Sequence, residues 1–372
     1  MISEDFFDRI QIQHKKGLPF VAYRKPNETK INGLLQSTKK VYTTEGYVES
    51  GFVFSPFDNS QKTILIPKKV SESIYTSDGL SFSDNSIQSK TEDVIEKAKI
   101  YHLNLIKKGV ETIENSDLKK VVLSRQEVVK LKEFNPITIF KSLLSHYNSA
   151  FVYCWYHPEI GLWLGATPET LLKIEGHRFS IMALAGTQDY KGSLDVIWQD
   201  KEQQEQQYVT DFILDNLKPF VNSCKVSDTQ TVKAGNLVHL KTMISAQLKP
   251  DTNLREMLSA LHPTPAVCGL PKLLAKQFIL EKEDYNREFY TGFLGELNID
   301  TKIAPRSGKR NIENRAYSIN KNSTQLYVNL RCMQLKKENA IIYVGGGITK
   351  NSSPEREWEE TVSKSLVIKK VL

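Results

Sequence analysis

Cysteine is scarce in this chain of 372 residues, with four copies that lie far apart in the sequence. They are Cys154, Cys224, Cys268 and Cys332, and three of them lie inside apolar runs. Disulfide-bonded domains and zinc sites need cysteines that recur at short, regular spacings. The wide spacing therefore predicts reduced thiols that pack in the interior of a cytoplasmic protein.

Long hydrophobic runs are also missing, and no apolar segment approaches the ~20 residues that cross a bilayer as a helix. The first residues include Glu4 and Asp5, whereas a secretory signal peptide begins with positive charge. We therefore expect neither a signal peptide nor contact with a membrane.

A strong excess of one charge is lacking as well. Lys and Arg total 50 and Asp and Glu total 43, which leaves a net charge of +7. This charge is compatible with an anionic substrate, although a generally basic surface explains it more simply. No basic segment is interleaved with aromatic residues, so we expect no nucleic acid partner. The content of 40% hydrophobic and 25% charged residues is typical of a folded globular protein.

The chain shows no internal repeat and no linker rich in proline, serine or glycine. We therefore predict one domain over residues 1–372. Residues 1–90 are weakly patterned, and residues 91–372 carry all the candidate motifs. In the first part, short strands are expected at 20–23, 51–54 and 63–66, and a Ser/Asp-rich surface loop at 71–89.

Patterns of apolar residues predict the elements of the second part. Helices are expected at 91–108, 137–144, 195–217, 272–280 and from Ser353 onward. Strands are expected at 119–125, 150–156, 162–164, 179–184, 235–248, 326–335 and 340–348. Three prolines and a glycine make 261–271 a rigid extended loop, in which His262 is expected to make a structural hydrogen bond.

The C-terminal strands place polar side chains next to glycines. In the strand predicted at 326–335, Asn329 and Arg331 share one face, because alternate residues of a strand point the same way. Gly345, Gly346 and Gly347 end the next strand, where bare backbone allows another group to approach closely.

The helix that follows begins with Ser353 as its N-cap and Pro354 at its first position. On this helix Glu357, Glu360 and Lys364 lie along one face. Two carboxylates, a lysine, a strand arginine and a glycine floor could together hold a small anion and a divalent metal. A solvated helix with one Glu–Lys pair is the simpler interpretation of this pattern alone.

Two further carboxylates occupy positions where the pattern predicts burial. Glu169 lies within a half-buried sheet, and burying a carboxylate without a partner is costly. Glu205 precedes Val209 and Phe212 by four and seven residues, so it continues the apolar face of its helix, whereas residues 201–204 mostly project outward. Such a carboxylate either has a buried partner or binds a metal, and the pattern does not decide between the two.

Eight motifs then occur in a fixed order. They are 120–125 (KVVLSR), 165–169 (GATPE), 184–187 (LAGT), the helix with Glu205, 261–266 (LHPTPA), 329–331 (NLR), 345–347 (GGG) and 353–360 (SPEREWEE). In this order they resemble the chorismate-utilising enzymes. That family includes isochorismate synthase, salicylate synthase and the large subunits of anthranilate and aminodeoxychorismate synthase. The resemblance covers residues from about 90 to 372.

The resemblance implies an α/β (α+β) fold with two large, mostly antiparallel β-sheets packed face to face and flanked by helices. The strand-rich pattern agrees with this fold. The resemblance also implies chorismate, a dicarboxylate, as substrate and one Mg²⁺ as cofactor. Relatives that use water as the nucleophile are often monomers, so we expect a monomer.

The residue at position 120 separates the branches of the family. Amine-forming members resemble one another in having glutamine there, whereas Lys120 could deprotonate water if its pKa falls towards neutrality. The resemblance therefore implies an isochorismate synthase, which adds water at C2 of chorismate and releases the C4 hydroxyl. Lys120 would be the base and Glu169 the acid. Ala185 stands where aminodeoxychorismate synthases commonly carry a nucleophilic lysine, which argues against that branch.

The resemblance also implies the remaining roles. Glu205 and Glu360 would hold Mg²⁺, and Glu357 would reach the metal through water. Arg331 would bind the enolpyruvyl carboxylate. The pocket would be completed by Gly186, Thr187, His239, Ala266, Gly345 and Lys364.

Alternatives stay open. A salicylate synthase would share the lysine base and would then eliminate pyruvate from isochorismate. An anthranilate synthase is disfavoured by Lys120. A non-catalytic relative should have lost at least one charged site residue. Isochorismate feeds both menaquinone and catechol siderophore synthesis, so the pathway is open too. Asn286 stands where relatives often have aspartate. The stretch 300–323, rich in Lys, Arg and Asn, is longer than the corresponding hairpin of typical relatives, and we interpret it as a flexible surface insertion of unassigned role.

Overall fold

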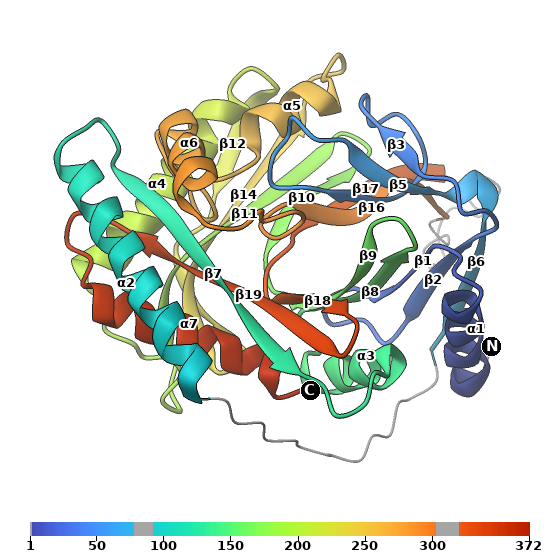
Figure 1. Cartoon of the computed structure of the whole chain (residues 1–372). Helices are drawn as coiled ribbons and strands as arrows, with labels where there is room; N and C mark the ends of the chain where they lie inside the picture. Colours follow the sequence, from blue (N-terminus) through green and yellow to red (C-terminus); the bar gives the residue numbers. More distant parts are fainter. Residues whose placement is uncertain (1, 78–91, 303–319) are drawn as a thin grey trace.

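Two β-sheets packed face to face form the protein, with helices on their outer sides (Figure 1). The computed structural model describes residues 2–77, 92–302 and 320–372. All strand pairs within the two sheets are antiparallel, which confirms the expected fold class.

The first sheet has nine strands. In the order of their pairing they are β15 (Gly269–Leu270), β7 (Lys120–Lys130), β19 (Asn339–Ile348), β18 (Cys332–Lys336), β9 (Gly161–Thr167), β8 (Phe151–His157), β1 (Phe20–Arg24), β2 (Ile31–Gln36) and β6 (Ser71–Thr76). Strands from both ends of the chain therefore share one sheet.

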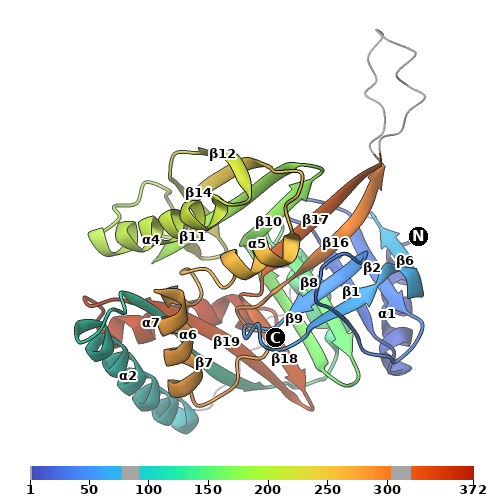
Figure 2. The same ribbon diagram turned by 90° about the horizontal axis from the view of Figure 1, so that it is seen from above.

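The second sheet has ten strands. In order they are β12 (Val221–Val226), β14 (Leu237–Leu248), β11 (Arg178–Asp189), β10 (Thr170–Glu175), β17 (Asn320–Val328), β16 (Phe293–Lys302), β4 (Gly51–Ser55), β5 (Thr63–Pro67) and β3 (Tyr42–Thr44), with β13 (Gln230–Ala234) paired to β14. Figure 2 shows this sheet above the strands β7 and β19 of the first.

Seven helices lie in the described part of the chain. They are α1 (Ser3–Lys15), α2 (Glu92–Glu114), α3 (Pro136–His146), α4 (Asp200–Leu217), α5 (Leu254–Leu261), α6 (Lys272–Lys282) and α7 (Pro354–Lys369). Helices α1 and α3 pack on the nine-stranded sheet and α4 on the ten-stranded sheet, while α2, α6 and α7 contact β7 or β19. None of the described helices is long and apolar enough to cross a bilayer.

Aromatic rings fill the space between the sheets. Phe151 of β8 stacks on Tyr327 of β17 with ring centroids 4.1 Å apart, and Phe54 of β4 stacks on Phe289 at 4.3 Å. Such pairs add about 0.5–1.5 kcal/mol to the stabilisation from burying their surface. Large rings between the sheets therefore hold them together.

Several elements differ from the sequence-based prediction. Residues 71–76 form strand β6, paired to β2, where a surface loop was expected, and residues 78–89 of that stretch lie outside the described residues. Only Ile74 and Thr76 of β6 are buried, so the strand has too little apolar alternation to be recognised. Helices α1 and α5 were not predicted, and α2 continues to Glu114 rather than ending at 108.

Helix α4 begins at Asp200 rather than at residue 195. Gln199 is its N-cap, and a capping box joins Gln199 to Glu202. This reciprocal pair satisfies backbone N–H groups at the start of a helix and so fixes where the helix begins.

The predicted strand 326–335 is interrupted. β17 ends at Val328 in one sheet and β18 begins at Cys332 in the other, so the chain crosses between the sheets. The Asn329 N–H donates to Gly292 O at 2.8 Å, and Arg331 has φ 47°. Asn329 and Arg331 therefore do not share a strand face, and that prediction is wrong.

The loop, the cysteines and the hairpin follow the prediction in part. His262 Nε2 lies 3.0 Å from Thr291 O, which confirms a structural hydrogen bond. All four cysteines are free thiols. Residues 300–302 and 320–323 belong to β16 and β17 rather than to a surface insertion, and residues 303–319 lie outside the described part.

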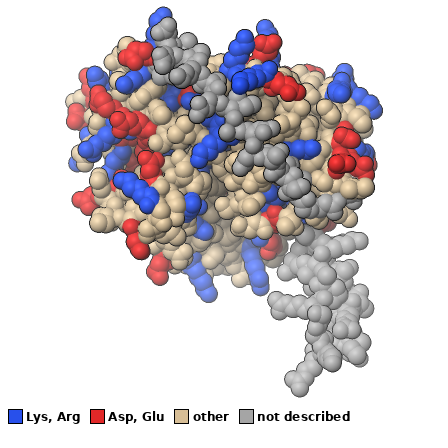
Figure 3. All heavy atoms as spheres, turned by 90° about the horizontal axis from the view of Figure 1, so that it is seen from below, with Lys and Arg blue, Asp and Glu red and all other residues tan. Residues whose placement is uncertain are grey.

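Both signs of charge are intermingled on the face drawn in Figure 3, wherever grey atoms do not cover it. Lysine and arginine side chains alternate there with aspartate and glutamate, so that part of the face carries no uniform basic patch.

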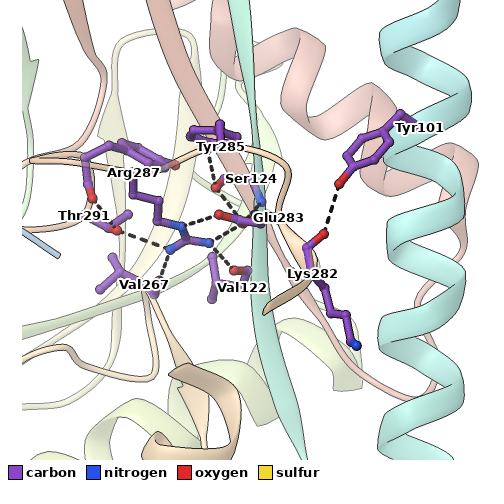
Figure 4. A network of polar contacts seen from close by, with 10 residues as sticks. Tyr101, Val122, Ser124, Val267, Lys282, Glu283, Tyr285, Arg287 and Thr291 are labelled. Carbon is purple, nitrogen blue, oxygen red and sulfur yellow. Dashed lines mark hydrogen bonds and ion pairs between the residues drawn. The ribbon is translucent and has the colours of Figure 1, made fainter. Parts of the chain in front are cut away.

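A buried arginine ties helix α6 to strand β7 (Figure 4). Arg287 donates to both carboxylate oxygens of Glu283, at 2.7 and 2.6 Å, and to Val122 O at 2.7 Å. Glu283 Oε1 also accepts from the backbone N–H of Ser124 at 2.8 Å. Burial of both partners makes this pair costly to break, because a single charge would remain without compensation.

We expect Arg287→Met to destabilise the protein by about 3–5 kcal/mol, because Glu283 would stay buried and unpaired. Urea denaturation measures the change in the free energy of unfolding. Arg9→Met is the control, since the Arg9–Glu72 pair is much more exposed, with 35% and 57% of the two side chains accessible. Such a surface pair contributes at most about 1 kcal/mol. Equal losses in the two variants would contradict the assignment.

Candidate active site

The residues to which the resemblance assigned a catalytic, substrate-binding or metal role all line one cleft, except Glu357. Its walls come from β7 and β19 of one sheet, from β11 and β14 of the other, and from helices α4 and α7. The cleft opens to solvent, and most of its lining residues are apolar or carry one of the polar groups described below. The singled-out lining residues are Lys120, Glu169, Gly186, Thr187, Glu205, His239, Ala266, Arg331, Gly345, Glu360 and Lys364.

Lys120 begins strand β7 and is 1% exposed. Its Nζ lies 3.8 Å from Glu205 Oε2. Burial lowers the pKa of Lys120, the charge of Glu205 opposes this, and the charges of Lys201 and Lys364 lower the pKa further. Buried amines with cationic neighbours can lose their proton more easily and so act as bases.

A bare glycine allows Lys120 and Glu205 to meet over β19. A Cβ atom added to Gly347 would lie 2.9 Å from Lys120 Cε and 3.1 Å from Glu205 Oε1. Gly347 pairs with Val122 in the sheet, so strand register sets this contact. The close approach that the glycine run predicted is therefore present.

Glu169 lies in the turn between β9 and β10 and is 3% exposed. Burial raises the pKa of its carboxyl to about 8, although the charges of Lys120 and Arg331 oppose the rise. At neutral pH the carboxyl is therefore mostly protonated. A neutral carboxylic acid on the wall of a cleft can donate a proton.

His239 and Arg331 form a chain with the backbone of β11. His239 Nδ1 lies 3.0 Å from Gly186 O, and Nε2 accepts from Arg331 Nη2 at 2.5 Å. Burial and the Arg331 charge hold the pKa of His239 well below its usual value, so the ring is neutral. Gly186 has φ 70° and forms a bulge, since the β11–β14 register shifts between Ala185 and Thr187.

Arg331 keeps its charge in this setting. Burial lowers the pKa of its guanidinium to about 10, which is still well above neutral pH. Its Nη1 donates to Ala234 O at 2.9 Å. Since guanidinium carries five N–H donors, Arg331 retains donors for an anionic ligand in the cleft.

Three carboxylates and three lysines gather where α4 and α7 approach β19. Lys364 Nζ lies 2.6 Å from Glu360 Oε1 and 2.8 Å from Gly345 O. Lys201 pairs with Glu357 and lies 3.9 Å from Glu205 Oε1. The expectation that Lys201 projects outward is therefore wrong, and its i,i+4 spacing from Glu205 was the signal that could have shown the contact.

The carboxylates fit a divalent cation by their chemistry, although they do not form a ready-made cage. Within residues 2–77, 92–302 and 320–372, no three His, Cys, Asp or Glu side chains are arranged to hold a metal ion. Glu357 Oε2, however, is buried and lacks a hydrogen-bond partner. A Cβ atom on Gly346 would lie 3.5 Å from Glu357 Oε2 and 3.5 Å from Glu360 Oε1. Carboxylate oxygens suit Mg²⁺, so the residues fit once their lysine contacts give way.

The apolar walls of the cleft were not predicted from the sequence. They include Leu184, Val267, Tyr290, Leu330 and Tyr343. Such residues resemble core residues in a sequence, and only the fold shows that they border open space. Asn329 is buried away from the cleft's lining and accepts a hydrogen bond from the Tyr153 hydroxyl at 2.6 Å.

Comparison with known proteins agrees with this geometry. A family model described as chorismate binding enzyme matches residues 47–313, and a second of the same description matches residues 316–370. The chain therefore belongs to the family of chorismate-binding enzymes.

Among individual relatives, isochorismate synthase MenF of Pasteurella multocida is 30% identical over 273 residues, which cover 70% of this chain and 58% of that protein. Isochorismate synthase DhbC of Bacillus subtilis is 27% identical over 281 residues, which cover 70% of this chain and 65% of that protein. The matches thus span less than two thirds of these relatives.

A solved structure shows the same fold. It is a putative 2,3-dihydroxybenzoate-specific isochorismate synthase, DhbC from Bacillus anthracis, with a TM-score of 0.77 and 22% identity. The superposition covers 97% of this chain and 99% of that chain. The likeness confirms the two-sheet architecture that the sequence motifs implied.

We expect Glu169→Gln to change how stability depends on pH. Since the pKa of Glu169 is about 8 in the folded protein and 4.5 in the unfolded chain, the folded state binds more protons between these values. Stability therefore falls as pH rises through this window, by at most ~1.4 kcal/mol per unit from this group. The variant lacks this loss, so its stability relative to wild type should rise with pH.

Urea denaturation at several pH values between about 5 and 8 tests this expectation. Glu355→Gln, at an exposed position on α7, is the control and should parallel wild type. A Glu169→Gln curve that also parallels wild type would show that the carboxyl is not held protonated by burial.

Proposed function

We propose that this chain is an Mg²⁺-dependent isochorismate synthase, which interconverts chorismate and isochorismate by adding water at C2 and releasing the C4 hydroxyl. The observation that carries the proposal is a buried lysine and a buried, protonated carboxyl on the walls of one cleft. Such a pair supplies the base and the acid that the reaction requires.

Lys120 is the base in this proposal. Its amine must be uncharged to accept a proton, and burial together with the charges of Lys201 and Lys364 favours that form. The amine takes a proton from the attacking water, and the resulting ammonium is then stabilised by Glu205 at 3.8 Å. Glutamine at this position could not accept the proton.

Glu169 is the acid. Its pKa of about 8 keeps the proton in place at neutral pH until the C4 hydroxyl departs. Once the carboxylate forms, the charges of Lys120 and Arg331 stabilise it. After the forward step Lys120 is protonated and Glu169 is a carboxylate. In the reverse reaction Lys120 is therefore the acid and Glu169 the base.

The remaining residues bind and orient the substrate. Arg331 would pair with the enolpyruvyl carboxylate through its planar fork. The neutral His239 holds Arg331 in place through the 2.5 Å hydrogen bond at Nε2. The rest of the binding set is Gly186, Thr187, Ala266, Gly345 and Lys364.

Glu205 and Glu360 would hold Mg²⁺ directly, and Glu357 would reach it through water. When bound, the metal supplies positive charge for the ring carboxylate of the substrate and for charge that shifts through the ring. The Lys–Glu contacts of the metal-free protein keep these carboxylates close to one another, with Lys201 between Glu357 and Glu205.

Incubation of the purified protein with chorismate and Mg²⁺, followed by chromatography, tests the proposal. We expect a mixture of chorismate and isochorismate that fails to form in EDTA. Salicylate with pyruvate would instead indicate a salicylate synthase, and ammonia-dependent anthranilate an anthranilate synthase. No product under any of these conditions would contradict a catalytic role.

Lys120→Gln should lower kcat by roughly a hundredfold or more while leaving the chorismate KM within a few-fold, because general-base catalysis is lost and binding groups remain. Lys130→Gln is the matched control, since Lys130 ends the same strand with an exposed side chain. Normal turnover in Lys120→Gln would show that Lys120 is not the base.

A further inference from the structure

Lys201 is a charged residue near the cleft that the proposed chemistry does not use directly. It lies in the first turn of α4 and pairs with Glu357 of α7. It also lies 3.9 Å from Glu205 Oε1, one turn further along its own helix. Lys201 therefore joins two of the carboxylates assigned to the metal.

The second carboxylate oxygen of Glu357 is unused in this arrangement. Glu357 is 2% exposed, and its Oε2 has no hydrogen-bond partner. It lies over the bare backbone of Gly346, where a Cβ atom would be 3.5 Å from it and 3.5 Å from Glu360 Oε1. A buried anionic oxygen without a partner is unfavourable, so this side of Glu357 is suited to a cation.

A second pocket, separate from the substrate cleft, opens beside Lys201. Its lining includes Lys201 of α4 and Glu357 and Glu360 of α7. Glu360 lines both this pocket and the cleft. The carboxylates assigned to the metal therefore lie between two openings.

Of the three lysines near these carboxylates, Lys201 is the one whose side chain borders the second pocket. Lys120 and Lys364 line the substrate cleft, whereas only Lys201 of these three lines the second pocket. Its side chain is 24% exposed, compared with 2% for Lys120. Its ammonium can therefore move into the second pocket and remain hydrated after it releases the carboxylates.

We propose that Lys201 is a stand-in for the metal: in the metal-free protein its ammonium holds Glu205 and Glu357 together, and a divalent cation binds by displacing it into the second pocket. This inference rests on the metal site of the proposed function. It assigns Lys201 a positioning role, since it touches the carboxylates rather than the substrate.

Charge balance supports the displacement. In the metal-free protein Lys201 neutralises Glu357, with which it pairs, and Lys364 neutralises Glu360. A divalent cation adds two positive charges to this balanced group, and like charges a few ångströms apart repel strongly when partly buried. Removal of the Lys201 ammonium relieves this repulsion and frees oxygens of two carboxylates.

Two variants separate the charge of Lys201 from its hydrogen bond. Lys201→Met removes both, and Lys201→Gln keeps a donor for Glu357 without the charge, which protects folding. Protein freed of metal with EDTA and dialysed is titrated with MgCl₂ in a calorimeter, without chorismate. We expect both variants to bind Mg²⁺ about tenfold more tightly than wild type.

Thermal unfolding provides a second readout. Metal-free Lys201→Met should melt at a lower temperature than wild type, because Glu357 loses its partner. Saturating Mg²⁺ should raise its melting temperature by more than it raises that of wild type. Lys201→Arg keeps the charge and should bind Mg²⁺ within a few-fold of wild type.

Lys218→Met is the matched control, because Lys218 follows the same helix and pairs with exposed Asp215 at 2.7 Å. It should leave the Mg²⁺ affinity unchanged. Equal or weaker Mg²⁺ binding in both Lys201→Met and Lys201→Gln would overturn the inference. The two variants could bind Mg²⁺ more tightly although the wild-type protein makes no isochorismate. That result would support the role of Lys201 and contradict the proposed reaction, so failure of one proposal can be told from failure of the other.

Discussion

The charged side chains of the cleft can meet because residues 345–347 of β19 carry no side chains. A Cβ atom at Gly345 would lie 2.8 Å from Leu123 O, and one at Gly347 would lie 2.9 Å from Lys120 Cε. Any larger residue would separate β19 from its neighbours or displace Lys120. Lys120, which is proposed as the base, and Glu205 of α4 meet over this strip of bare backbone.

Burial then acts in opposite directions on the two groups assigned to proton transfer. It lowers the pKa of Lys120 and raises that of Glu169 to about 8, because both lose water around their charged forms. Both shifts therefore move the group towards its uncharged form before substrate binds. The fold prepares these states by enclosing the two groups, and no strong hydrogen bond is needed to select them.

Sequence order was enough to predict the two-sheet fold and to collect the residues of the cleft, because the ordered motifs carry information about distant parts of the chain. It failed where local signals were weak. Strand β6 has few buried apolar residues, and α4 begins where a capping box places it. The sequence pattern predicted one continuous strand through residues 329–331 because strands flank them on both sides. These two strands belong to different sheets.

The contact of Lys201 with Glu357 could not be predicted for a different reason. It joins residues that are 156 positions apart, and Lys201 looks like any solvent-facing lysine on its own helix. The apolar walls of the cleft were missed because Tyr290, Tyr343 and their neighbours have the character of core residues. Only the packing of the two sheets shows which side chains border a cavity.

The strand order has a consequence for how the polypeptide acquires its structure during synthesis. β18 and β19 lie between β7 and β9, and β16 and β17 lie between β10 and β4, so late strands occupy interior positions of both sheets. Strands that are synthesised earlier lack their partner strands until the C-terminal part of the chain has been made. Their unpaired edges are prone to aggregate during this time. Neither sheet can add its strands in the order in which they are translated. Folding therefore depends on contacts between distant segments, and such contacts form slowly.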